Sequence, residues 1–246
     1  MANNEISGIV LLMALAKYIS EKKNRMFTYR IIFIPETIGS IIYLSRNISE
    51  MKKNIIAGFN VTCVGDNKTF SFLPSKYGNT LADKLAKHVL KYHVDKVKYY
   101  SFLDRGSDER QYCSPGVDLP IVSIMRSKYG TYREYHTSLD NMNFISSKGL
   151  EKSYQIYTKC IDILEKNKKY KLTTRCEPFL SSKGLYAEKS NINLFKKIQK
   201  NTKSILDFIS YADGTNDLID IANIIQTSAY ELLPLIENLA SKKIIK

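Results

Sequence analysis

Four polar segments of the sequence contain the residue types that hydrolytic sites use. They are residues 2–8 (ANNEISG), 35–40 (PETIGS), 105–112 (RGSDERQY) and 135–140 (YHTSLD). We place them at the ends of apolar strands or at the start of an apolar helix, where an α/β sheet usually carries its functional loops. The pattern therefore predicts that segments far apart in the sequence contribute to one site.

Oxygen and nitrogen side chains in these segments could build a hydrolytic metal site. Such a site needs protein ligands, an open position for water and a nearby carboxylate that takes a proton. The chain has three histidines, and His136 is the best candidate ligand. Asp140 or a backbone carbonyl would then orient its ring. The alternative is that His136 is a hydrogen-bonded structural residue in a Tyr-rich loop.

Taken together, the four segments resemble the zinc-dependent aminopeptidase clan. In that clan, these segments supply metal ligands and a catalytic carboxylate. The closest resemblance is to a bacterial branch of aminopeptidase-like proteins of unknown function, which carry a C-terminal winged helix and are often encoded among surface-polysaccharide genes. It extends over essentially the whole chain and rests on residues 33–40 (FIPETIGS), 101–113 (SFLDRGSDERQYC), 135–140 (YHTSLD) and 211–214 (YADG).

The resemblance assigns roles to six residues. It places Glu36 at the position of the catalytic base, although an acid there could also be a helix cap. It places His136 and Asn4 at metal-ligand positions, with zinc as the cofactor. Contacts to a small peptide or amide substrate fall on Asp108, Arg110 and Tyr135.

Several positions depart from the pattern of the clan. Asn4 stands where the clan has a bridging aspartate, and a neutral amide is a poorer zinc ligand than a carboxylate. Thr37 and Thr62 stand where the clan has a glutamate and an aspartate. The resemblance therefore implies a metal-dependent peptidase or amidohydrolase linked to surface-polysaccharide metabolism. The alternative is a catalytically inactive aminopeptidase fold that acts as a binding or scaffold protein.

Strands and helices alternate along the first two thirds of the chain, which predicts an α/β fold. Apolar side chains around most of the circumference of the first helix predict that it is buried. With the resemblance, we expect a three-layer sandwich around a mixed, mostly parallel sheet. We expect helices at 5–20, 39–49, 79–92 and 150–166, and strands at 29–34, 55–64, 69–73, 97–103 and 119–125.

The predicted domains are an aminopeptidase-like α/β domain at 1–170, a linker at 171–190 and a small all-α, winged-helix-like domain at 191–246. The last has helices at 191–211, 217–226 and 229–239. The resemblance implies that the α/β domain is truncated at its N-terminus, so that the chain corresponds to the C-terminal part of a longer family member.

Charge and composition limit the kinds of partner that we expect the chain to bind. The chain has 246 residues and a net charge of +13, but residues 204–246 carry 3 basic and 6 acidic side chains. Binding in a DNA groove relies on cations, so we expect the C-terminal helices to contact a protein or a second copy of the chain, and not nucleic acid. No apolar run reaches the roughly 18 residues of a membrane span, and the four cysteines lack C-x-x-C spacing. We expect a cytoplasmic protein with free thiols and no membrane partner.

Overall fold

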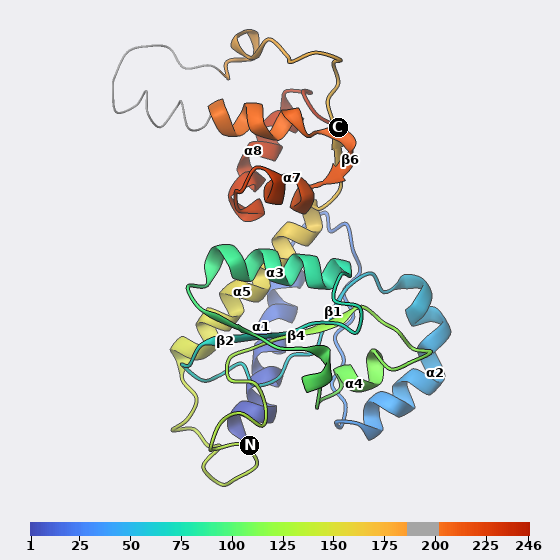
Figure 1. Cartoon of the computed structure of the whole chain (residues 1–246), viewed down its shortest axis with the longest axis vertical. Helices are drawn as coiled ribbons and strands as arrows, with labels where there is room; N and C mark the ends of the chain where they lie inside the picture. The colour runs from blue at the N-terminus through green and yellow to red at the C-terminus, as the bar shows by residue number, and fades with distance from the viewer. Residues whose placement is uncertain (186–201) are drawn as a thin grey trace. The chain divides into compact units, whose positions relative to one another are not determined.

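The computed structural model describes residues 1–185 and 202–246, and its chain divides into two units, Met1–Ile161 and Asp162–Lys246 (Figure 1). Unit 1 has a short π-helix and several helices around four strands. The helices are η1 (Ala2–Ile6), α1 (Ser7–Glu21), α2 (Ile38–Asn54), α3 (Leu81–His93), η2 (Phe102–Asp104), α4 (Glu109–Tyr112) and α5 (Ser147–Lys166), the last of which continues into unit 2. The strands are β1 (Gly58–Phe59), β2 (Phe70–Leu73), β3 (Val97–Tyr99) and β4 (Ile121–Met125).

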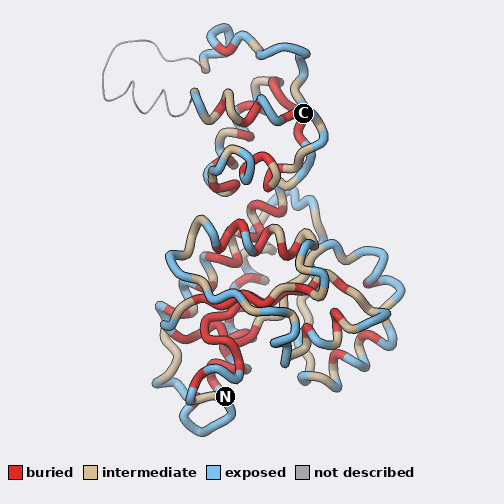
Figure 2. The backbone as a smooth tube through the Cα atoms, viewed as in Figure 1, coloured by how far each residue is buried: buried red, intermediate tan, exposed pale blue. Residues whose placement is uncertain are grey.

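The four strands form one mixed sheet in the order β1-β4-β2-β3. The β1–β4 and β2–β3 pairs are parallel, and only β2 and β4 run antiparallel, with Phe72 opposite Ile124. Every residue of β2 and β4 is buried, so these strands form the centre of the core (Figure 2). The predicted fold class, a mixed and mostly parallel sheet with helices, is confirmed.

Helices enclose this sheet, with α1 and α5 behind it in the view of Figure 1. The Tyr157 hydroxyl on α5 donates a hydrogen bond to the Ile124 carbonyl of β4 at 2.8 Å. On α1, Gly8 lies so close to the backbone at Val61 that a Cβ atom would stand 2.1 Å from the Val61 oxygen. Only glycine allows this helix to approach the sheet so closely.

The first helix differs from its prediction in one respect. Its residues are helical as predicted, but only one face is buried, and that face includes Leu11 and Leu15. On the opposite face, Ile9 and Met13 are exposed. Both faces of the helix are apolar, and the described residues cover only the face that includes Leu11 and Leu15.

The prediction of a buried strand at 29–34 is wrong. These residues belong to no helix or strand of the described chain, and Phe33 is 53% exposed. The apolar run predicts an extended conformation, whereas pairing also needs a neighbouring strand. Two other predicted strands are shorter than expected, since 55–64 reduces to β1 and 97–103 to β3 followed by η2.

Unit 2 combines a two-stranded sheet with a small group of helices. β5 (Lys169–Lys171) pairs antiparallel with β6 (Asp213–Asp217), within a unit that also contains η3 (Leu180–Lys183), α7 (Leu218–Ile224) and α8 (Ala229–Ser241). Residues 202–210 are helical, and the part of the predicted helix at 191–201 lies outside the described residues. The residues for which we predict a linker, 171–190, fall within this unit as far as they are described.

Candidate functional site

Asp140 holds the start of the chain in place. Its carboxylate accepts hydrogen bonds from the backbone N–H groups of Asn3 at 2.6 Å and Asn4 at 3.1 Å. Asp140 is only 4% exposed. A carboxylate at this position satisfies two N–H groups at the helix start and interacts favourably with the helix dipole. The loop that carries His136 is thereby fixed beside Asn4.

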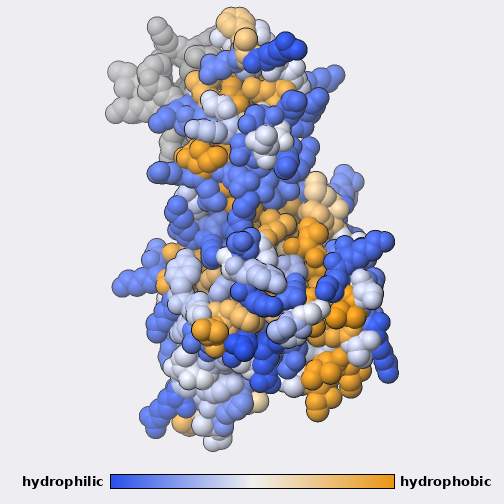
Figure 3. Space-filling view, turned by 45° about the vertical axis from the view of Figure 1, so that its right-hand side comes forward, coloured by the Kyte–Doolittle hydropathy of each residue, from blue (hydrophilic) through white to orange (hydrophobic). Residues whose placement is uncertain are grey.

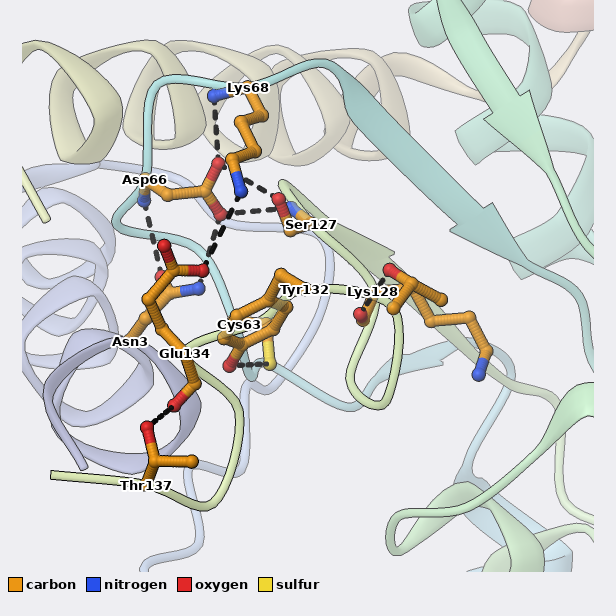
Figure 4. A network of polar contacts seen from close by, with 10 residues as sticks. Asn3, Cys63, Asp66, Lys68, Ser127, Lys128, Tyr132, Glu134 and Thr137 are labelled. Carbon is orange, nitrogen blue, oxygen red and sulfur yellow. Dashed lines mark hydrogen bonds and ion pairs between the residues drawn. The ribbon is translucent and has the colours of Figure 1, made fainter. Parts of the chain in front are cut away.

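The side chain of Asn3 ties the same helix start to the loop after β1 (Figure 4). Its carbonyl oxygen accepts hydrogen bonds from the backbone N–H groups of Gly65 and Asp66, and its amide nitrogen donates to the Asp66 carboxylate at 3.1 Å. The other partners of Asp66 include both the backbone N–H and the hydroxyl of Ser127. Every polar atom of the Asn3 side chain has a partner in a fully buried position, so this residue is structural.

The neighbouring Asn4 side chain points into the candidate site with a defined orientation. Its oxygen accepts a hydrogen bond from the Cys63 thiol at 3.4 Å. Its amide nitrogen lies 3.0 Å from a Glu5 carboxylate oxygen and 3.4 Å from Nε2 of His136. A carboxylate only accepts hydrogen bonds when ionised, so the Glu5 contact requires the NH₂ group on this side. Asn4 therefore turns donors, and not its oxygen, toward His136.

Cys63 supports this orientation because it stays protonated. Burial raises the pKa of its thiol to about 12, and the residue is completely enclosed. A protonated thiol is a hydrogen-bond donor, which fits its contact with the Asn4 oxygen. The same burial makes Cys63 unsuited to act as a nucleophile, since the thiolate is the reactive form.

Glu36 and Thr37 sit on a strained turn at the start of α2. Thr37 has a φ of 63°, which is rare for a β-branched residue. Asp108 accepts a hydrogen bond from the Thr37 backbone N–H at 2.8 Å, and Arg110 donates one to the Thr37 hydroxyl at 2.7 Å. Strain of this kind persists where surrounding contacts hold it, and it is found often at functional sites. Asp108 and Arg110 thus fix the backbone that presents Glu36.

The environment of Glu36 favours its protonated form. Partial burial raises the pKa of Glu36 above its ordinary value, and the nearby charges of Asp108 and Glu5 raise it further. A hydrogen bond with Ser107 and the charge of Arg110 act in the opposite direction without reversing the shift. A carboxyl group with a raised pKa is better matched to proton transfer near neutral pH.

Tyr135 and His136 complete the cluster from the fourth segment. Their rings stack with centroids 3.9 Å apart, and His136 adopts a φ of 56°. Burial raises the pKa of Tyr135, and the charges of Glu36 and Glu5 add to the shift. Tyr135 therefore lies close enough to feel charges from the segments of Glu5 and Glu36, which places all four polar segments at one site.

Glu109 is a site residue whose role is not apparent from the sequence. It is fully buried, and one of its oxygens accepts hydrogen bonds from the backbone N–H groups of Gly106 and Ser107 and from the Tyr129 hydroxyl at 2.6 Å. Its other oxygen accepts one from Asn60 at 2.9 Å. With four donors, Glu109 shapes the loop that presents Asp108. An acid at the start of a short helix, as Glu109 is in α4, carries no sequence pattern that distinguishes this role.

The donor set does not fit a catalytic zinc ion. Such an ion needs three protein ligands, and the described residues contain no group of three His, Cys, Asp or Glu side chains that could hold a metal. Asn4 directs an NH₂ group toward His136, which repels a cation. The metal-ligand roles of His136 and Asn4 remain predictions from the resemblance. Asp140, expected near the His136 ring, instead binds the backbone of Asn3 and Asn4.

The fold and the gathered residues define an aminopeptidase-like α/β domain followed by a winged-helix domain. A family model described as a domain of unknown function, DUF4910, matches residues 1–167, and a winged helix-turn-helix model matches residues 168–246. The chain belongs to the DUF4910 family and carries a C-terminal winged helix-turn-helix domain.

A curated relative and a solved structure, both from Clostridium acetobutylicum, support this class. One, described as a candidate polysaccharide biosynthesis protein with an aminopeptidase-like domain, is 39% identical over 223 residues, which are 90% of this chain and 50% of the relative. The other is a crystal structure of a candidate peptidase, with 34% identity and a TM-score of 0.89 over 100% of this chain and 54% of that one. This chain thus spans about half the length of each.

Two more distant structures share the fold alone. LapA of Legionella has a TM-score of 0.53 at 20% identity, over 67% of this chain and 48% of its own. An aminopeptidase from Aneurinibacillus sp. strain AM-1 has a TM-score of 0.50 at 17% identity, over 65% of this chain and 39% of its own. The expected resemblance to aminopeptidases is therefore confirmed at the level of fold.

The raised pKa of Glu36 predicts how stability changes with pH. The folded state holds the proton of Glu36 more tightly than the unfolded state, so ionisation at neutral pH lowers stability. We expect Glu36→Gln to raise the Tm at pH 7, with a gain that disappears below about pH 4, near the unfolded pKa. Thermal unfolding from pH 3 to 8, followed by circular dichroism, measures this.

Glu50→Gln is the matched control, because a hydrogen bond from Arg30 lowers the pKa of Glu50. Its ionised form stabilises the fold at neutral pH, so this substitution should reduce the Tm slightly at pH 7 and have no effect below the lowered pKa. A Glu36→Gln variant that is less stable than the wild type at pH 7 would contradict the assigned shift.

Proposed function

We propose that the α/β unit acts on a small peptide or amide in the manner of aminopeptidases, with Glu36 as the group that accepts and returns a proton. The observation that carries this proposal is the convergence of the four polar segments, in which Glu36 lies close to Asp108 and Glu5 while Asn4 contacts His136. Structural residues alone would not need a carboxyl group with a raised pKa that still reaches solvent.

In this proposal, each of the other side chains has a positioning role. Asp108 and Arg110 hold the strained backbone at Thr37, and with it the direction of the Glu36 side chain. The exposed amino group of a peptide is a cation, and the carboxylates of Glu5 and Glu36 favour it electrostatically. Tyr135 supplies an apolar ring beside them. A zinc ion would need ligands beyond those of the described residues, so no step of the proposal passes through one.

The biological setting is proposed from the relatives. The description of the Clostridium acetobutylicum relative joins an aminopeptidase-like domain to polysaccharide biosynthesis. We extend this to an amide substrate in surface-polysaccharide metabolism. Within residues 1–185 and 202–246, no helix is both long and apolar enough to cross a membrane. The cytoplasmic location expected from the sequence is proposed here on the free state of all four cysteines.

The orientation of Asn4 favours a second candidate, a binding or scaffold protein without catalysis. The Asn4 amide directs N–H donors toward His136, where the resemblance places a carboxylate. The hydroxyl groups of Thr37 and Thr62 form hydrogen bonds with other residues of the protein. Thr62 donates its hydroxyl to the Asn4 carbonyl at 2.6 Å. Such a protein would bind the same class of ligand and release it unchanged.

An aminopeptidase assay with aminoacyl p-nitroanilides distinguishes the two candidates. If Glu36 transfers a proton, Glu36→Gln and Glu36→Ala should each lower kcat/KM about 100-fold or more, with Glu50→Gln unchanged. Turnover that survives both Glu36 substitutions would contradict the assigned role. Absence of turnover, with peptide binding that depends on Glu36 by calorimetry, would favour the binding protein.

For unit 2, we propose that the winged helix-turn-helix domain contacts protein and not DNA. Helix α8 contains Glu231 and Glu237 and no lysine or arginine, so it lacks the cations that neutralise phosphates. Unit 2 as described also has Asp217 and Asp220 together at the start of α7. A protein partner or a second copy of the chain remains the proposed ligand of these helices.

A gel-shift titration with duplex DNA tests this. We expect unit 2 to give no salt-sensitive shift at micromolar protein between 50 and 200 mM salt, because α8 carries no basic residue and would therefore release few counterions. The charge-reversed variant Glu231→Lys/Glu237→Lys is the positive control. A salt-sensitive shift of the wild type that equals or exceeds that of the variant would overturn the proposal.

A further inference from the structure

Helix α3 and strand β3 carry a cluster of lysines that no described carboxylate neutralises. Residues 84–98 contain five lysines and a single acidic residue, Asp95. Elsewhere in unit 1, the exposed Arg30 is neutralised by Glu50 at 2.7 Å. In residues 84–98, four lysines are exposed and form no ion pair with any residue that the structure describes, namely Lys87, Lys91, Lys96 and Lys98. Lysines grouped in this way give the surface a positive potential that attracts polyanions.

The crossover from β2 to β3 places two of these lysines beside an aromatic ring. The two strands are parallel, so α3, which connects them, runs back along the strands (Figure 1). Nζ of Lys87 lies 6.0 Å from the centroid of the Phe72 ring, and the Tyr99 ring lies 6.0 Å from the same ring. Lys91 follows Lys87 by about one turn, or about 6 Å along the helix axis. Lys87, Lys91 and Tyr99 therefore share one surface.

Exposed tyrosine rings flank Lys87 on this surface. Tyr99 is 58% exposed and Tyr77 is 61% exposed. The Lys87 ammonium donates a hydrogen bond to the carbonyl of Gly78, next to Tyr77, at 2.7 Å. An ammonium group has three N–H donors, so two of them remain for a ligand. We call Tyr77, Lys87, Lys91 and Tyr99 the lysine–tyrosine surface.

The composition of this surface indicates the class of polyanion. Residues 76–99 contain no arginine, whose planar fork is the preferred partner of phosphate groups and base edges. Lysine is a compact point charge that suits single carboxylates. The exposed tyrosine rings offer apolar faces, against which the C–H face of a sugar ring can pack. Figure 3 shows that the surface of unit 1 is mainly hydrophilic away from the apolar side chains on the side of α2.

We propose that the lysine–tyrosine surface binds an anionic polysaccharide, a chain of sugar rings that carry carboxylates. Lys87 and Lys91 pair with carboxylates of the polymer, and Tyr77 and Tyr99 pack against its sugar rings. Within the described residues, no hydrogen bond or ion pair joins this surface to the four polar segments. The proposal therefore does not rest on the proposed catalysis by Glu36.

Calorimetric titration of the full chain with polygalacturonate tests the proposal. Neutral dextran and single-stranded poly(dT) are the comparison polymers. We expect polygalacturonate to bind, poly(dT) to bind more weakly and dextran to give no heat of binding. The affinity for polygalacturonate should fall about fivefold or more between 50 and 200 mM salt, because salt screens exposed charges.

Substitution of lysines tests whether the binding is local or follows the net charge. Lys87→Gln/Lys91→Gln should weaken polygalacturonate binding about tenfold or more, because it removes both paired cations. Lys148→Gln/Lys152→Gln is the matched control, since it removes the same charge from two exposed lysines at the same spacing on α5. This control should change the affinity less than about twofold.

Substitution of tyrosines tests the contact with sugar rings without changing the charge. Tyr77→Ser and Tyr99→Ser should each weaken polygalacturonate binding about threefold or more. Phe33→Ser is the control, because Phe33 is a 53% exposed aromatic residue outside the lysine–tyrosine surface. It should leave the affinity unchanged. Thermal unfolding of each variant confirms that it folds, and Tyr77→Ser keeps the test valid if Tyr99→Ser lowers stability.

Four outcomes would overturn the proposal. The first is that polygalacturonate does not bind, or binds no better than dextran. The second is equal weakening by Lys87→Gln/Lys91→Gln and by Lys148→Gln/Lys152→Gln. The third is full affinity in both tyrosine variants, which would reduce the surface to a charge effect. The fourth is tighter binding of poly(dT) that the same lysine substitutions weaken, which would make a nucleic acid the ligand.

Discussion

The contact on which the site depends is the one between the Asp140 carboxylate and the backbone N–H groups of Asn3 and Asn4. It joins the first turn of the chain to a loop more than 130 residues away, and it satisfies helix-start donors that would otherwise be buried without partners. Asn3 then secures the same turn to Asp66. Because this turn is fixed on both sides, Asn4 contacts His136, and Glu5 lies near enough for its charge to raise the pKa of Glu36.

The orientation of the Asn4 amide determines whether the site presents a hydrogen-bond donor or an acceptor next to His136. The protonated Cys63 thiol binds the oxygen, and Glu5 binds the nitrogen, so both neighbours select the same orientation. A fold shared with aminopeptidases thus presents hydrogen-bond donors where a metal ion would need a negatively charged ligand. The chain also carries Glu36, to which we assign proton transfer, on a turn that Asp108 and Arg110 hold in a strained conformation.

The sequence predicts much of this architecture, because the apolar periodicity of residues 5–20, 79–92 and 150–166 is set by local helix geometry. The meeting of the four polar segments is also predictable from the resemblance, although no strand precedes the second segment. The sequence wrongly predicts a strand at residues 29–34, because an apolar run does not reveal whether a neighbouring strand exists to pair with it. Nor were the roles of Asp140 and Glu109, because a carboxylate that binds backbone amides looks the same in sequence as a catalytic one.

The orientation of Asn4 is tested most directly by zinc titration calorimetry on the wild type, Asn4→Asp and each of these combined with His136→Ala. We predict that His136→Ala leaves zinc binding by the wild type unchanged, because Asn4 and His136 do not form a metal site together. Asn4→Asp should gain zinc binding that His136→Ala removes, since a carboxylate then faces the imidazole. Tight stoichiometric binding by the wild type that His136→Ala abolishes would contradict the account.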